Sequence, residues 1–333
     1  MTEAPWFEDF SVGDDLSHVP SITVSDGYAA VHQAMFADRY RLAIDAPLCK
    51  KVTGEDRLLV NPSLVCNIAI GSSTVPTQRV LGNLFYRGLR FHRPVYIGDT
   101  LTTSTKVVAL RQNSIKARRA ASGMVGLEIH TLNQHDETVL LFWRCPMVPC
   151  MDPDADTGLD DDLGVMPESV SENDVLASVP DWDLSALPEE TMSFQPGEVI
   201  DVEARDTITM APELVRMTLN MAMTHTDATR SVYKKRLVYG GHTISMAASQ
   251  LARVLPSMAM ILCWYKCDHL APVFEEDILA SRISVQDVVP VANGRVLKLG
   301  IEVFAERVTE DDEAQKGIRV LDWQLAVLAG PNG

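Results

Sequence analysis

Apolar and polar positions change their period along the chain in a regular order, and this order occurs twice. In the first half, apolar residues with helical spacing between 64 and 69 predict a helix that begins near Pro62. Proline is favourable there because the N–H that it lacks has no intrahelical acceptor in the first turn. An earlier helix is predicted from about 26 to 37, with Ser25 as its N-cap, and residues 38–45 are predicted as a loop.

After the helix at Pro62, apolar residues recur at every second position, which is typical of antiparallel strands with one buried face. Four strands are predicted in succession, at residues 80–87, 101–108, 126–132 and 138–143. A turn from Phe91 to Leu101, rich in proline and glycine, separates the first strand from the second.

The second half repeats this plan. Ile208-Thr209 corresponds to Ile22-Thr23, a helix is predicted from about 211 to 223, and a second helix from about 241 to 254. Strands are then predicted at residues 258–267, 279–286, 296–304 and 320–328.

The two turns give the most specific match between the halves. From His92 to Leu101 and from His269 to Leu279, the order is Pro, Val, an aromatic residue, an acidic residue and Leu. The two histidines are predicted to occupy equivalent places and to share a structural role. A matched order over five elements indicates a duplication.

A long helix followed by antiparallel strands, twice in tandem, predicts an α+β fold of the double hotdog type. In this architecture each half is a long central helix wrapped by an antiparallel β-sheet. The predicted organisation is an N-terminal hotdog (1–150), an acidic linker (151–190) and a C-terminal hotdog (191–333).

The net charge of −16 is concentrated in one segment and is therefore a weak indication of binding partners. Between Met151 and Glu190 there are thirteen Asp or Glu residues and no Lys or Arg, so this segment carries most of the charge. It is predicted to be a solvated linker. Nucleic acid is excluded as a partner, because binding it requires basic patches.

Hydropathy and cysteine usage favour a cytoplasmic protein without membrane insertion. No run of eighteen apolar residues occurs, and the N-terminus lacks the basic and apolar regions of a secretory signal. The six cysteines lie mostly in apolar segments and are predicted to be buried thiols. Cys263 and Cys267, with His269 nearby, have the wrong spacing for a zinc site, and we predict no metal.

Candidate chemistry is concentrated between Leu219 and Ala248. Asn220, His225 and Asp227 come first, an apolar run follows, and Gly240-Gly241 then begins the second helix. N–H groups at a helix start have no intrahelical acceptor, and glycine lets a ligand oxygen approach them closely. An imidazole, a carboxylate and free N–H groups in one cleft would suit an enolate-forming enzyme.

Three segments carry a family resemblance. They are Phe7-Glu-Asp-Phe, Arg93-Pro-Val-Tyr-Ile-Gly-Asp-Thr-Leu and, most specific, Arg236-Leu-Val-Tyr-Gly-Gly-His-Thr-Ile-Ser. With them the chain resembles the MaoC-like enoyl-CoA hydratase (acyl dehydratase) superfamily, and within it the branch of mesaconyl-CoA hydratase, or methylmalyl-CoA dehydratase. The resemblance covers nearly the whole chain apart from the acidic linker.

The usual catalytic phrase of this superfamily is Asp-x-Asn-Pro-x-His, followed by x-Asp. In the second half, His225 falls on the His and Asp227 on the later Asp, whereas Asn220 takes the place of the first Asp. An amide can orient water but cannot remove its proton. The mesaconyl-CoA hydratase branch, as the resemblance implies, carries a similar Asn-then-His arrangement.

The first half departs from the phrase in the other direction. Asp38 and Asp45 can be placed on the two Asp positions, but Ala43 stands where the His belongs. A gap-free register from Thr23 would instead place Arg39 at the His position. The resemblance implies that this half is non-catalytic and shapes the acyl tunnel.

Hydration of an enoyl thioester requires a base for water, an acid for the α-carbon and donors for the enolate oxygen. We predict that His225 is the acid and base, that Asn220 positions the water, and that Asp227 holds either the imidazole or the loop.

The predicted substrate-binding residues have separate roles. The backbone of Gly240 and Gly241 binds the thioester oxygen, and Tyr239 forms a wall. His242 either binds the thioester or caps backbone groups, and Asp38 contacts substrate from the first half.

The predicted function is therefore that of a hydratase or dehydratase for a short or branched enoyl-CoA thioester. The alternatives are an acyl-CoA thioesterase and a non-catalytic acyl-CoA-binding protein, because fold alone does not choose among them. No cofactor is predicted beyond the CoA that the substrate carries, since no nucleotide-binding glycine motif is present. The protein is expected to be a monomer or a homodimer.

Overall fold

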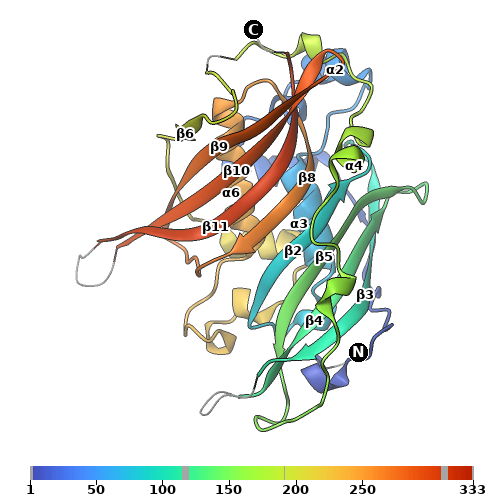
Figure 1. Ribbon diagram of the computed structural model, residues 1–333, viewed down its shortest axis with the longest axis vertical. Helices are drawn as coiled ribbons and strands as arrows, with labels where there is room; N and C mark the ends of the chain where they lie inside the picture. Colours follow the sequence, from blue (N-terminus) through green and yellow to red (C-terminus); the bar gives the residue numbers. More distant parts are fainter. Residues whose placement is uncertain (1–2, 115–119, 191, 309–313, 332–333) are drawn as a thin grey trace.

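A computed structural model describes residues 3–114, 120–190, 192–308 and 314–331 of the chain. Figure 1 shows two similar units, each with a sheet curved around a central helix. The elements of the first unit are β1 (Ile22–Thr23), α1 (Asp26–Phe36), α2 (Ala46–Thr53), α3 (Pro62–Ser72), β2 (Gly82–Phe91), β3 (Thr100–Gln112), β4 (Ser122–Leu132) and β5 (Thr138–Pro149).

The second unit has a similar order, but it begins with two short strands and has one helix fewer. Its elements are β6 (Val199–Asp201), β7 (Asp206–Thr207), α5 (Ala211–Met217), α6 (Gly240–Val254), β8 (Met258–His269), β9 (Ile278–Val291), β10 (Gly294–Val308) and β11 (Ala314–Ala329). The eight strands predicted from the period of two are all present, and most extend beyond their predicted ends.

All these strands form one sheet of eleven, in the order β1-β3-β4-β5-β2-β8-β11-β10-β9-β6, with β7 paired to β9. The two units meet where β2 pairs with β8 in antiparallel register, with Tyr86 opposite Cys267. The central helices α3 and α6 meet as well, and Asn67 of α3 donates a hydrogen bond to Ser245 of α6 at 2.8 Å. The sheet and the two central helices therefore enclose one continuous core.

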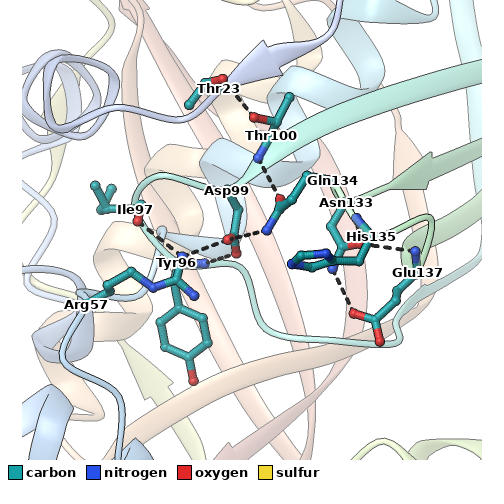
Figure 2. A network of polar contacts seen from close by, with 10 residues as sticks. All are labelled: Thr23, Arg57, Tyr96, Ile97, Asp99, Thr100, Asn133, Gln134, His135 and Glu137. Carbon is teal, nitrogen blue, oxygen red and sulfur yellow. Dashed lines mark hydrogen bonds and ion pairs between the residues drawn. The ribbon is translucent and has the colours of Figure 1, made fainter.

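The matched turns have the same geometry, as the duplication requires. Asp99 accepts a hydrogen bond from the Tyr96 backbone N–H, and Asp277 accepts the equivalent bond from Phe274, both at 2.9 Å. Each aspartate also pairs with an arginine of its own unit. Figure 2 shows the first of these networks, in which Asp99 meets Arg57 and Gln134.

One predicted helix is too long, and one observed helix was not predicted. The helix predicted to reach 223 ends at Met217, because Leu219 adopts a left-handed backbone with φ of 55° that no α-helix continues through. The predicted 38–45 loop is followed by α2, which the periodicity did not indicate and for which Asp45 is the N-cap.

The register of the short strands is shifted too. Val24 donates to the Asp99 carbonyl, and Ile208 donates to the Asp277 carbonyl. Ile22 therefore corresponds to Asp206 rather than to Ile208.

The two histidines of the turns are not equivalent. The His92 backbone N–H donates to Val139, and the matching bond in the second unit comes from Leu270, not from His269. Because side chains alternate across a strand, a shift of one residue places His269 on the opposite face from His92. The shared structural role predicted for them is therefore wrong.

The acidic segment 151–190 is not a solvated linker. It contains α4 (Glu172–Ala177), and it buries Val175 and Leu184 to 1% exposure each. Its carboxylates form ion pairs and hydrogen bonds with both units: Asp174 with Arg90, Glu172 with Lys298 and Tyr265, and Glu190 with Arg295. Figure 1 shows α4 in front of the sheet, with α3 and α6 behind it. The basic partners in the two units explain why so acidic a segment is ordered.

All six cysteines are buried free thiols, as expected. Among the described residues, no helix has both the length and the apolar character needed to cross a lipid bilayer.

Candidate active site

A cavity of about 280 Å³ opens beside the N-terminus of α6, at the junction of the two units. Its walls come from β2, β5, the segment 220–239 and the turn that follows β8. Of the predicted site residues, four line it: Asn220, His225, Tyr239 and Gly240. Part of the segment that the sequence singled out therefore lines one cavity.

His225 lies in a short 3-10 turn (Met223–His225) and its ring is half-buried in the cavity wall. The ring nitrogen Nδ1 lies 2.8 Å from the Leu237 carbonyl oxygen. A carbonyl only accepts, so Nδ1 carries the proton, and Nε2 has the free lone pair in the neutral ring. Burial lowers the pKa of His225 to about 4, against a weaker raising effect of the Leu237 bond. At neutral pH the imidazole is thus an uncharged base.

Asn220 is 7% exposed, and its two polar atoms have different surroundings. Its Oδ1 accepts a hydrogen bond from the Ala222 backbone N–H at 2.9 Å, which fixes the orientation of the amide. Its Nδ2 has no acceptor among the described residues. A buried N–H without a partner is costly, so this donor is available to a ligand or a water molecule.

Tyr239, the residue before α6, provides a second donor without a partner among the described residues, its phenolic hydroxyl. The Tyr239 ring lies 5.6 Å from the His225 ring, centroid to centroid. Burial raises the pKa of Tyr239 well above its ordinary value, so the phenol is a neutral donor. Tyr239 lines the same cavity as Asn220.

Gly240 and Gly241 have different structural roles. A Cβ on Gly240 would lie 2.5 Å from Nε2 of His269, so glycine is needed there for the His269 ring to lie against the helix start. A Cβ on Gly241 would overlap Oδ1 of Asn67 on α3. Gly241 does not line the cavity, and its absent side chain serves the contact between the central helices. Of the pair, only Gly240 is placed to offer its N–H to a ligand.

The other predicted site residues lie outside the cavity lining. The Asp227 carboxylate accepts from the Thr229 N–H and hydroxyl, at 2.8 and 2.7 Å, so it orders the loop and does not hold the imidazole. Nε2 of His242 donates to the Thr209 carbonyl at 2.8 Å, and the ring packs on Phe36. Of the alternatives for His242, the structure favours the backbone contact.

Asp38 is also remote from the cavity lining, and its geometry shows how the halves correspond. It accepts hydrogen bonds from the Tyr40 N–H and from Asn61, whereas the equivalent bond in the second unit is made by Asn220. The backbone N–H of Ala43 donates to the Tyr40 carbonyl, and the backbone N–H of His225 donates to the Ala222 carbonyl in the same way. Ala43 therefore stands at the position of the histidine, and the structure gives Asp38 a role in fixing its own loop, not in contacting a substrate.

The cavity residues that the sequence analysis missed include Tyr86 on β2, Arg144 on β5 and His269 at the end of β8. Arg144 was detectable, because it interrupts the otherwise apolar run Leu140-Leu-Phe-Trp-Arg-Cys. His269 was misassigned through the one-residue error in register. No Asp or Glu is among the described residues that line the cavity, whereas two histidines, His225 and His269, are.

Comparison with known proteins gives two curated relatives over most of the chain. Mesaconyl-CoA hydratase of Cereibacter sphaeroides is 29% identical over 335 residues, with 94% of each protein covered. Beta-methylmalyl-CoA dehydratase of Chloroflexus aurantiacus is 31% identical over 290 residues, with 82% of this chain and 80% of the relative covered. No family model matches the chain.

Among solved structures, a conserved hypothetical protein of Mycobacterium tuberculosis with a double hotdog fold is 41% identical. It superposes with a TM-score of 0.89, and 98% of each chain is covered. The predicted fold is confirmed, and so is the predicted resemblance. The chain is an enzyme of the MaoC-like hydratase and dehydratase family, in the branch of mesaconyl-CoA hydratase and beta-methylmalyl-CoA dehydratase.

Proposed function

We propose that the protein adds water reversibly across the 2,3 double bond of a short or branched enoyl-CoA thioester, with mesaconyl-CoA or a related compound as substrate. The observation that carries this proposal is that one cavity holds the neutral His225, a helix start and two donors that have no acceptor within the described part of the chain. The names of the two curated relatives support it.

In the hydration direction, Nε2 of His225 takes a proton from water while the water oxygen bonds to C3. The electron pair of the double bond moves towards the thioester, and the N–H of Gly240 stabilises the enolate oxygen. The imidazolium then returns the proton to C2, so that one water is added and the enzyme is regenerated. A lowered pKa suits the second step, because it makes the imidazolium a stronger acid.

Asn220 and Tyr239 position the reactants. The Nδ2 of Asn220 can donate a hydrogen bond to one lone pair of the water oxygen. This bond orients the water so that its other lone pair can attack C3. Tyr239 can donate to the acyl group from the same wall. Neither group needs to change its protonation state, because His225 alone takes up and returns the proton in this scheme.

The CoA portion is too large for a cavity of about 280 Å³, so only the acyl end enters it. Tyr233 lines the cavity and belongs to a basic surface loop with exposed side chains at Arg230, Lys234 and Lys235. We assign the CoA phosphates to this loop, because three cations there contrast with the acidic rest of the protein.

The test follows the loss of the enoyl thioester band in the ultraviolet, with mesaconyl-CoA and straight-chain enoyl-CoA compounds. We expect wild type to turn over at least one of them and His225→Ala to be slower by about 10²–10⁴-fold. His92→Ala, a half-buried histidine outside the cavity, is the matched control. Equal rates for wild type and His225→Ala would refute the assignment.

Release of free thiol without loss of the double bond would instead indicate a thioesterase. That alternative is disfavoured because no carboxylate is among the described residues that line the cavity.

A further inference from the structure

Arg144 is a buried guanidinium that faces the cavity from the middle of β5. It is 3% exposed, and its Nη2 donates to the Ser73 carbonyl at 2.7 Å and to the Thr77 hydroxyl at 2.9 Å. These bonds fix the plane of the group against the end of α3. Its Nε has no acceptor among the described residues. The protein thus orients the guanidinium but uses only some of its N–H donors.

The charge of Arg144 is not compensated. No carboxylate of the described chain forms an ion pair with it, and burial lowers the pKa of the guanidinium without any opposing acidic residue. Among the described lining residues, Arg144 carries the only formal charge at neutral pH, since burial keeps His225 and His269 neutral. A buried charge without a partner is unfavourable by several kcal/mol, so it calls for a functional explanation.

The duplication supplies an internal comparison. On β5, Arg144 lies opposite Tyr86, and in the second unit Leu325 on β11 lies opposite Trp264. The backbone bonds of His92 and Leu270 show that these pairs correspond. The fold therefore accepts leucine at this position, and nothing in the architecture itself requires an arginine.

We propose that Arg144 is the residue that sets acyl specificity in this reaction, by binding the free carboxylate at the far end of the acyl chain. This inference rests on the proposed function. Arg144 lies opposite Tyr86 on the neighbouring strand, both line the cavity together with Tyr239, and Tyr239 in turn lies beside His225. An acyl group with its thioester at Gly240 thus has the catalytic base and the guanidinium in the same cavity.

The phosphates of CoA are a less suitable partner for this arginine. They stay outside the cavity, where the basic loop at 230–235 is exposed to solvent. A carboxylate, in contrast, can accept charge-assisted hydrogen bonds from the N–H groups on Nε and Nη1 that Ser73 and Thr77 do not use, and a buried site strengthens such bonds. We therefore expect Arg144 to bind the acyl group of the substrate rather than the CoA phosphates.

Two matched substrates test the proposal. Mesaconyl-CoA carries a carboxylate on C3, and 2-methylbut-2-enoyl-CoA carries a methyl group in its place. We expect wild-type kcat/KM to favour the carboxylated compound by about 10²-fold or more. Arg144→Gln should lower kcat/KM for mesaconyl-CoA by about the same factor and change that for the neutral compound by less than about threefold. Arg144→Lys should retain part of the preference, and Arg282→Gln, an exposed arginine paired with Asp201, should retain all of it.

A binding measurement separates this proposal from the proposed function. Methylsuccinyl-CoA and 2-methylbutanoyl-CoA are the saturated counterparts and cannot be hydrated, and their affinities can be measured by calorimetry. Tighter binding of methylsuccinyl-CoA that Arg144→Gln abolishes would support the carboxylate site even if no hydration were detected. Equal affinities of wild type for the two analogues, or equal losses for both in a folded Arg144→Gln protein, would overturn it.

Discussion

Two buried histidines make the fold sensitive to acid in a way that can be calculated. His32 on α1 is 2% exposed and His242 on α6 is fully buried, and both rings lie 4.8 Å from the ring of Phe36. Burial lowers their pKa values to about 3 and about 4, from an ordinary value of 6.5. Both are therefore neutral in the folded protein at pH 5, whereas both would be protonated in the unfolded chain.

The sign follows from proton uptake. Below pH 6.5 the unfolded state binds more protons than the folded state, so the free energy of unfolding falls as the pH falls. The effect continues down to about pH 4 for His242 and about pH 3 for His32. Between pH 8 and pH 5 each histidine should cost about 2 kcal/mol, or about 4 kcal/mol for the pair.

The assay is urea unfolding at pH 8 and at pH 5, for wild type, His32→Leu and His242→Leu. Each variant should lose about 2 kcal/mol less than wild type between the two pH values, whatever its stability at pH 8. Comparing each variant with wild type also cancels two other effects of pH on stability. One is the weaker charge repulsion within an acidic protein at low pH, and the other is the opposite contribution of Asp38, whose pKa is raised by burial. His135→Gln, at an exposed position, is the control. Variants that lose as much stability as wild type would refute the reasoning.

Two further predictions concern the active site. For His225, kcat/KM measured after rapid pH jumps should stay level from pH 8 to about pH 5 and fall tenfold per unit below about pH 4, because protonation removes the base; an inflection near 6.5 would contradict the burial effect. Gly241→Ala should lower stability by about 1–3 kcal/mol and slow turnover, because the new Cβ overlaps Asn67 and lies 2.7 Å from the Tyr239 ring. Gly27→Ala, with no contact closer than 3.4 Å, is its control in the same urea and rate assays, and equal stability of the two variants would count against the clash.

Much of the fold was predictable because its signals are local. Alternating strands, the proline at the start of α3 and the glycines at the start of α6 each follow from a few neighbouring residues. The acidic segment 151–190 was misjudged because its ordering depends on basic partners in both units, such as Arg90 and Lys298. Such contacts between distant residues leave no period in the sequence.

The site was predictable to a similar extent. His225, Asn220 and Tyr239 came from one contiguous segment, which the fold keeps together. Arg144 reaches the same cavity from β5, about eighty residues earlier, and only the pairing of β2 with β5 and β8 brings it there. The separate roles of Gly240 and Gly241 could not be predicted, since they depend on what lies opposite each Cα.

The covalent joining of the two units changes what a single substitution does. When identical chains pair about a twofold axis, every mutation is made twice, once on each side. In this chain an arginine could enter one wall while leucine stayed at the corresponding place in the other, so no second uncompensated cation had to be accommodated. The copies are free to diverge one residue at a time, and redesign of acyl selectivity needs a change in only one of them.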